Sequence, residues 1–368
     1  MRGAGDFAGI GVPFAAGVAA GALLFAPGFR SPVLLPAVAS ILLFLLTGYS
    51  FLRFDNGTRT VTVRVTFGIL FLLTGAFCSL NSALAAGIPV PEGPLSRLAG
   101  MCEKKLCCTI DNVPYPSGTT GPLVKALLTG DRGGLDRTTV GIFRDSGASH
   151  ILALSGLHLG VIYLILSRLT RPLGNGPRAR KARYSLILGA SGFYALMTGA
   201  SPSIVRAFLF ILLGETASLL GREKDPARVL LAALTVQLAL DPGVVSSTGF
   251  QLSYLAMTGI AFVYPALERL YPDDWGRWDP FRKVWQAAVL SISCQVFTAP
   301  LVWLRFRTFP KYFLMTNLTA LPLTSAVMVL SVVTTALSFT GNCPYFLVML
   351  DDRAVQLLLR CLEVISSM

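Results

Sequence analysis

The sequence predicts an all-α polytopic membrane protein with about eight to ten membrane-embedded helices, including short or re-entrant segments, and an interfacial amphipathic helix. The chain is 53% hydrophobic and only 14% charged, whereas soluble domains carry about 25% charged residues. Its apolar residues come in blocks close to the ~20 residues that span a bilayer. Its only two histidines, His150 and His158, lie inside one such block, where an unpartnered polar group is costly.

The chain begins with three predicted spans, at about 8–27, 32–52 and 63–86, which form an N-terminal transmembrane region over 1–87. A polar stretch rich in glycine and proline follows at 88–120. It is too short for a sizeable soluble domain, so we expect a short extracytoplasmic loop there.

The stretch 121–147 mixes apolar and charged residues. Three leucines recur at the spacing of one helix face: Leu123, Leu127 and Leu128. We expect an interfacial amphipathic helix that is interrupted at Gly130 and again at Gly133 and Gly134.

A helix predicted over about 148–167 carries the polar residues of the apolar block. Ser155 and His158 lie three residues apart and would share one face of it. Core residues satisfied by neighbouring helices would show the same pattern, but ionisable residues in a membrane more often mark a pathway or a site. We expect one polar cavity bordered by His150, Ser155, His158 and either Arg206 or Gln251.

The loop 168–183 holds six basic residues and no acidic one, which places it in the cytoplasm by the positive-inside rule. Counting spans backwards puts 88–147 outside and the N-terminus in the cytoplasm. The basic residues of this loop either only fix the topology of the chain or bind an anionic partner.

The remaining elements follow the same apolar pattern. Further spans are expected at about 184–200, 202–220, 248–267, 284–304 and 322–340, with a short apolar piece at 229–240. Asn317, between Pro310 and Pro322, suggests a broken or re-entrant segment that would line a cavity. An amphipathic tail closes the chain at 341–368.

The turn at Ser201, Pro202 and Ser203 has the residues of a helix start, whose free N–H groups suit phosphate. Arg206 follows one turn later, at membrane depth, where it needs an anionic ligand or a structural partner. Other polar residues in apolar spans, each of which alone would be a tie between helices, are Gln251, Ser253, Gln295 and Asn317. Taken together, these residues predict a polar-lined path through the membrane.

The sequence lacks the residues that several kinds of functional site require. The cysteines have no second Cys/His pair, so no metal site is expected, although a Cys102–Cys107 or Cys102–Cys108 disulfide is compatible with an extracytoplasmic loop. No Gly-Lys dipeptide occurs, so there is no P-loop. Gly189-Ala-Ser191-Gly has the form used by intramembrane serine proteases, but no histidine follows His158 to act as base. We expect neither an enzyme nor a cofactor.

The order of these motifs resembles the competence domain of ComEC-type DNA-uptake channels, over about 121–340. The segments that carry the resemblance are L-T-G-D-R at 128–132, S-H-I-L-A-L-S-G-L-H-L-G at 149–160, G-A-S-P-S-x-x-R-A at 199–207, D-P at 241–242, G-F-Q-L-S at 249–253 and N-L at 317–318. The H-x-x-A-x-S-G-x-H segment after G-D-R is the specific one.

The resemblance implies an inner-membrane channel, in a bacterium, that imports one DNA strand during natural transformation. Its extracytoplasmic mouth would carry Asp131, Arg132, Arg137 and Arg144. Expected partners are single-stranded DNA, an extracytoplasmic DNA receptor, a cytoplasmic helicase or strand-binding protein, and membrane lipid. The pore could form within one subunit or between two copies of the chain. Without the resemblance, the alternatives are a small-molecule or lipid-intermediate transporter and, less favoured, an intramembrane serine protease.

The family's two soluble domains are not expected in these residues. An OB fold does not fit in 88–120, and no H-x-H-x-D-H motif of a metallo-β-lactamase-like nuclease occurs.

Overall fold

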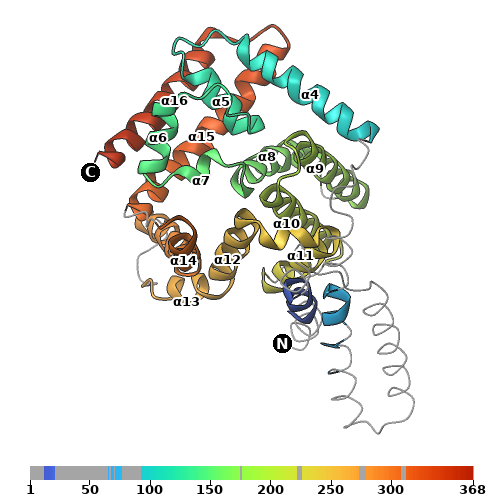
Figure 1. The fold of residues 1–368 in the computed structure, drawn as a ribbon. Helices are drawn as coiled ribbons and strands as arrows, with labels where there is room; N and C mark the ends of the chain where they lie inside the picture. Colours follow the sequence, from blue (N-terminus) through green and yellow to red (C-terminus); the bar gives the residue numbers. More distant parts are fainter. Residues whose placement is uncertain are drawn as a thin grey trace, which may run out of the picture. The chain divides into compact units, whose positions relative to one another are not determined.

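The computed structural model describes residues 12–20, 65, 68–69, 71–76, 93–174, 176–221, 226–272, 279–307 and 312–367. The chain divides into two compact units, and each is described here by itself. The first comprises Met1–Pro91 with Gly221–Tyr254, and the second comprises Glu92–Leu220 with Leu255–Met368. Within the described ranges every regular element is a helix (Figure 1), which confirms the all-α prediction.

Four helices in the described part of the chain are long and apolar enough to cross a membrane. They are Pro202–Leu219, Thr248–Glu268, Phe281–Phe306 and Phe313–Phe339. The chain is thus a polytopic membrane protein. Of the three spans predicted before residue 88, the one at 32–52 lies outside the described residues, and the other two are described only in part.

In the first unit, two short helical stretches, 12–20 and 71–76, run in backbone contact. A Cβ added to Gly17 would meet the carbonyl of Leu72, and one added to Gly75 would meet that of Phe14. Small residues permit this close approach of membrane helices. The unit also holds α11 (Pro226–Leu240), the 3-10 helix η2 (Pro242–Ser246) and the start of α12 (Thr248–Phe262).

The second unit begins with α4 (Pro94–Asp111), α5 (Thr120–Thr129) and α6 (Arg137–Asp145). The predicted loop 88–120 therefore contains an 18-residue helix. Pro94 opens it at the first helical position, where its missing N–H has no intrahelical role. The breaks predicted after α5 are confirmed, since Gly130 ends α5 in the left-handed conformation with φ +84°.

Next come α7 (Ser149–Leu152), α8 (Gly156–Leu169), η1 (Arg171–Leu173), α9 (Pro177–Met197) and α10 (Pro202–Leu219). The tight turn predicted before residue 202 is present, with positive φ at Gly199 and Ala200. Its amide N–H groups bond back to the end of α9, from Ala200 N to Ala195 O at 2.8 Å. The turn therefore reverses the chain within a few residues and packs α10 on α9.

The unit closes with α13 (Tyr264–Glu268), α14 (Pro280–Phe306), α15 (Phe313–Phe339) and α16 (Tyr345–Ser366). The broken segment predicted around Asn317 is wrong within the described residues, because α15 runs through Asn317 and Pro322 without interruption. Packing against α14 and α16 supports α15, and such support lets a membrane helix keep an interior proline.

The main core of the second unit joins segments from both ends of it. Figure 1 shows α16 lying along α15, and these two helices share the largest contact of the unit. The large, completely buried side chains of this core include Leu123, Leu127, Phe143, Ile151, Met328, Leu358 and Leu362. The predicted C-terminal tail is therefore an integral helix of the fold.

Candidate functional site

The apolar block with the two histidines is not one helix, so the prediction of a continuous helix over 148–167 is wrong. The chain is extended at Ala153, with ψ 128°, and α8 starts after Ser155. Ser155 N donates to Nδ1 of His158 at 3.1 Å, while Ser155 Oγ accepts from Leu157 N at 3.3 Å. This reciprocal cap satisfies donors at the helix start and stabilises a new N-terminus at this point.

His158 is completely buried at this N-terminus. Its Nδ1 accepts the Ser155 amide and lies 3.1 Å from the Ser155 hydroxyl, which assigns the ring proton of the neutral imidazole to Nε2. That Nε2 is buried and has no hydrogen-bond partner among the described residues. A donor left in this state costs about 1–3 kcal/mol, so it suits an acceptor that arrives from outside the chain.

Arg206 joins this pair from α10. Its Nη2 lies 3.4 Å from the position that a Cβ on Gly156 would occupy, and the residue is 9% exposed. The structure therefore joins Ser155 to His158 and places Arg206 against Gly156, at the start of the same helix. At the start of α10, Ser201 is the N-cap residue but makes no side-chain cap bond, and Ser203 is half-buried.

The Gly130 turn packs against the break between α7 and α8. A Cβ on Gly130 would collide with the side chain of Leu154, the residue just before Ser155. The end of α5 is held from the other side by Tyr194 of α9, whose hydroxyl donates to Leu128 O at 2.9 Å. The T-G-D-R segment and the histidine segment, 20 residues apart in sequence, thus form one local structure.

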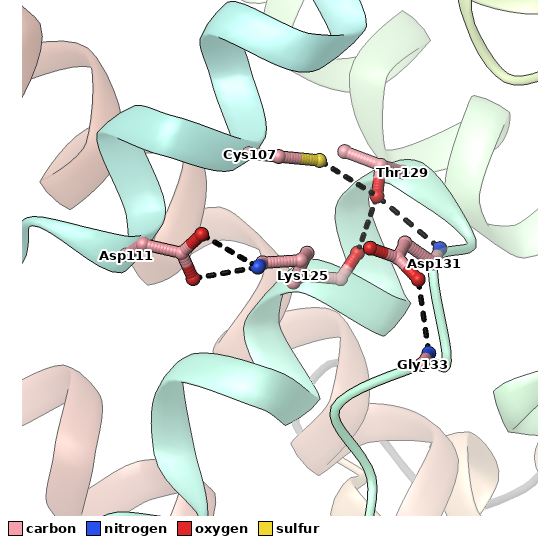
Figure 2. A network of polar contacts seen from close by, with 6 residues as sticks. All are labelled: Cys107, Asp111, Lys125, Thr129, Asp131 and Gly133. Atoms are coloured by element: carbon pink, nitrogen blue, oxygen red, sulfur yellow. Dashed lines mark hydrogen bonds and ion pairs between the residues drawn. The ribbon is translucent and has the colours of Figure 1, made fainter.

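A polar network fixes the start of this loop (Figure 2). Lys125 Nζ pairs with Asp111 of α4 at 2.6 Å, and Thr129 Oγ1 donates to Lys125 O at 2.9 Å. The same hydroxyl accepts from Asp131 N at 3.3 Å, and Asp131 Oδ1 accepts from Gly133 N at 2.9 Å. Side chains of two helices thereby hold a loop that contains three glycines.

Cys107 of α4 joins the network through a 3.8 Å contact to Thr129, and burial raises the pKa of its thiol. Cys102, Cys107 and Cys108 are all free. In each predicted disulfide the two cysteines lie five or six residues apart on one helix. Their Cα atoms are therefore at least about 7.5 Å apart along the helix axis, which is too far for a disulfide.

The residues predicted to form the extracytoplasmic mouth are all exposed: Asp131, Arg132, Arg137 and Arg144. Arg144 pairs with its neighbour Asp145 at 3.0 Å. Arg137 opens α6, whose N-cap Asp136 accepts from Thr139 N at 3.3 Å. Interactions with the Thr139 side chain and then with its backbone lower the pKa of Asp136. The described part of the loop therefore offers cations at its surface.

The other predicted site residues lie elsewhere. His150 is on α7, is exposed, and bonds Gly147 O at 3.2 Å through Nδ1. No hydrogen bond within the described ranges joins it to Ser155 or His158. Gln251 and Ser253 belong to the first unit, where Gln251 Nε2 donates to Val245 O at 2.8 Å.

Gln295 of α14 and Asn317 of α15 each bury an amide atom, Nε2 and Oδ1 respectively. Neither atom has a hydrogen-bond partner among the described residues. That these two side chains line the path remains a prediction. The serine of the protease-like motif, Ser191, is completely buried, and its Oγ likewise has no partner there, so neither histidine is bonded to it.

Sequence reasoning missed one polar centre. Asp351 and Asp352 of α16 are 0% and 6% exposed. Asp351 accepts from Tyr115 at 2.8 Å and from Ser331 at 2.9 Å, while Asp352 accepts from Ser117 Oγ at 2.9 Å and from Thr120 at 2.5 Å. The sequence signal was two adjacent acids in an amphipathic helix, a pattern that normally marks a solvated face.

Comparison with known proteins matches residues 127–368 to a family described as "Competence protein". ComE operon protein 3 of Bacillus subtilis is 31% identical over 41% of this chain and 19% of its own length. Competence protein ComA of Neisseria gonorrhoeae is 31% identical over 46% of this chain and 25% of its own. Recombination protein 2 of Haemophilus influenzae is 26% identical over 56% of this chain and 27% of its own.

The matched segments thus span roughly a fifth to a quarter of these relatives. No solved structure matches the chain.

Proposed function

The chain belongs to the competence protein family, and from this we propose that it supplies part of the path by which a single DNA strand crosses the bacterial inner membrane during DNA uptake. One observation supports this path more than any other. At the N-terminus of α8, the imidazole N–H of His158 is buried, and the guanidinium of Arg206 lies close to Gly156 of the same helix turn. Both groups are donors suited to phosphate oxygen.

A single strand carries one phosphate per nucleotide, so it needs donors and cations along its route without one tight anion trap. The exposed Arg132 and Arg137 near the Gly130 turn suit an extracytoplasmic mouth, and the basic residues of 168–183 suit the opposite one. Gln295 and Asn317 would add neutral polar groups between the mouths.

If His158 belongs to the path, this proposal requires the path to open. His158 has no exposed surface, so a strand cannot reach it without movement. The residues 153–155 are the natural place for that movement, because they lie between α7 and α8 and belong to neither helix. The Gly130 turn, which packs on Leu154, would move with them.

Inward transport of a polyanion opposes an inside-negative potential at about 2.3 kcal/mol per charge per 100 mV. We therefore infer an energy-supplying or strand-trapping partner in the cytoplasm, a helicase or strand-binding protein, and a receptor that delivers DNA outside. A pore between two copies of the chain is compatible with this proposal. We assign the chain no catalytic step and no cofactor.

The test compares two substitutions at one position in the native host. Glutamine is an ordinary partner in a capping box, so His158→Gln retains an acceptor for Ser155 N but removes the imidazole. His158→Leu removes both, and loss of a helix cap costs about 0.5–2 kcal/mol. We expect both variants to lose entry of labelled DNA into the cytoplasm, with only His158→Leu also losing stability.

His150→Gln is the matched control, because His150 is exposed and bonds only to a nearby carbonyl among the described residues. Normal DNA entry in the His158→Gln variant would show that the imidazole takes no part in the path. Normal entry in a strain that lacks the whole protein, together with loss of another imported solute, would favour the transporter alternative.

A further inference from the structure

An apolar pocket of about 400 Å³ lies in the second unit between α4, α5, α8, α9 and α15. Its lining includes Leu106, Ile162, Met197 and Val332, and Phe339 stands at the end of α15. Ligand pockets are typically about 300–1,000 Å³. This one is large enough for a ligand, and its walls select an apolar one.

A cation stands beside this pocket. Lys105 Nζ lies 4.6 Å from the ring centroid of Phe339, a cation–π contact that holds the ammonium against the pocket's own lining. Phe339 is the last residue of a helix long enough to cross a membrane. The pocket therefore combines apolar walls with a positive charge at the end of a membrane span.

The exposed face of α4 has the composition of a helix at a membrane surface. Leu95, Leu98 and Met101 are 55%, 49% and 67% exposed, and Lys105 follows one turn later on the same face. Large apolar residues interleaved with lysine are typical of helices that lie in the lipid interface. This face of α4 is therefore suited to contact with lipid.

We propose that the pocket holds an acyl chain of an anionic phospholipid, whose headgroup phosphate binds Lys105. The apolar lining fits the chain, the lysine complements the phosphate, and the end of α15 is the depth at which chain and headgroup meet. A nucleic acid does not fit, because its phosphates and polar base edges would have to lie against a mostly apolar lining. The proposal goes beyond DNA uptake and does not depend on it.

The pocket borders the site at α8. Leu128 and Tyr194 line it, and the hydrogen bond between the Tyr194 hydroxyl and Leu128 O holds the end of α5. A lipid chain in the pocket would therefore support the same helix end that positions the Gly130 turn.

The test uses the full protein in phosphatidylcholine nanodiscs that contain a phosphatidylglycerol with a photoreactive diazirine in its acyl chain. Ala336 lines the pocket, so Ala336→Phe should fill it. Val333, on the same helix, is 42% exposed, so Val333→Phe adds the same ring outside. We expect label on peptides that contain Met197 or Val332, a several-fold loss in Ala336→Phe, and no loss in Val333→Phe.

A second comparison tests the headgroup. Lys105→Gln should abolish the preference for the phosphatidylglycerol probe over a phosphatidylcholine probe with the same chain, whereas Lys104→Gln should keep it. Ala336→Leu, a smaller filler, replaces Ala336→Phe if thermal unfolding shows the larger ring to be disruptive. Labelling confined to exposed helix faces, or unchanged by either pocket filler, would overturn the proposal. No DNA enters this assay, so its failure leaves the proposed path untouched.

Discussion

Asp351 and Asp352 are adjacent in sequence but differ in the donors that surround them. Asp352 accepts from the backbone N and hydroxyl of Ser117 and from the Thr120 hydroxyl. Asp351 accepts from two hydroxyls, those of Tyr115 and Ser331, and its burial raises the pKa of its carboxyl. No cation forms an ion pair with either acid in the described part of the chain, so hydroxyl and amide donors hold them.

The raised pKa of Asp351 gives a pH dependence with a definite sign. The folded state binds this proton more tightly than the unfolded state, so the associated stability is present below the ordinary value of 3.8 and is lost as pH rises through the folded value. Asp351→Asn should therefore become more stable relative to the parent protein as the pH rises from 3.8 toward neutral. Thermal unfolding over that range measures it, and parallel pH curves for the two proteins would contradict it.

Asp352→Asn is predicted to behave differently. Three groups donate hydrogen bonds to the two carboxylate oxygens of Asp352. In asparagine one of these oxygens is replaced by an amide nitrogen, which cannot accept a hydrogen bond. We expect a loss of about 1–3 kcal/mol in the free energy of unfolding near neutral pH, because a buried donor is left unpaired. Ser117→Ala in the Asp352→Asn background should recover part of it, and no recovery would show that the donors are not the cause.

The elements depend on glycines at two kinds of position. Gly259 of α12 is a close-approach glycine, since an added Cβ would strike the backbone carbonyl of Ser293 on α14. Backbone cannot move aside as a side chain can, so Gly259→Ala should force the helices apart at a cost of about 1–3 kcal/mol. Gly189→Ala is the control, because no atom lies near its added Cβ and alanine favours a helix. Equal unfolding temperatures of the two variants would refute the contact.

Gly130 combines a positive φ with a close neighbour. Gly130→Ala should lose about 1–2 kcal/mol from the left-handed backbone alone, and more from the collision with Leu154. Adding Leu154→Ala removes the collision but not the backbone cost. A thermodynamic cycle over the two positions should therefore show a coupling energy, and strictly additive losses would place Leu154 away from the turn.

The sequence predicted elements best where apolar residues form long uninterrupted blocks. The turn before α10 and the breaks after α5 were predictable, since glycine and proline mark them. The break before α8 was not, because its cap pairs Ser155 with a histidine in place of the usual Glu or Gln. The continuity of α15 was also missed, because a proline such as Pro322 normally indicates a helix break in a sequence. The neighbouring helices that support α15 are visible only in the structure.

Within the candidate site, the sequence paired Ser155 with His158 for a partly wrong reason. These two residues are joined because a helix begins after Ser155, and not because they share one face of a continuous helix. The buried acids of α16 were beyond sequence reasoning, because all their donors except Ser331 lie at 115–120, more than 230 residues away.

At the scale of the whole molecule, the basic loop 168–183 contains residues with different roles. Arg180 donates from Nη2 to the carbonyls of Ser218 and Leu219 at 3.0 Å, which caps the end of α10. Arg178 and Lys181 are exposed. A charge count alone cannot separate the structural cation from those available to a partner.

Two sets of substitutions separate these roles. Arg180→Gln should lower the free energy of unfolding by about 0.5–1.5 kcal/mol, because it removes a cap. Arg178→Gln with Lys181→Gln should leave folding intact and reduce DNA transfer, as expected if the loop contacts the strand or its cytoplasmic partner. Cysteine accessibility on both sides of the membrane reports topology. An inverted topology without any other defect in the double variant would identify the loop as a plain anchor.

The position of α16 in the chain also constrains how the protein is made. Thr120 bonds to Asp352, 232 residues further on, so this buried contact cannot form until α16 has been synthesised. At about 5–20 residues per second, that delay is on the order of ten to fifty seconds. During it the nascent α5 and its polar neighbours must wait at the membrane without their final partner. Completion of the second unit is therefore a late event of biosynthesis, set by the ribosome and not by the rate of helix formation.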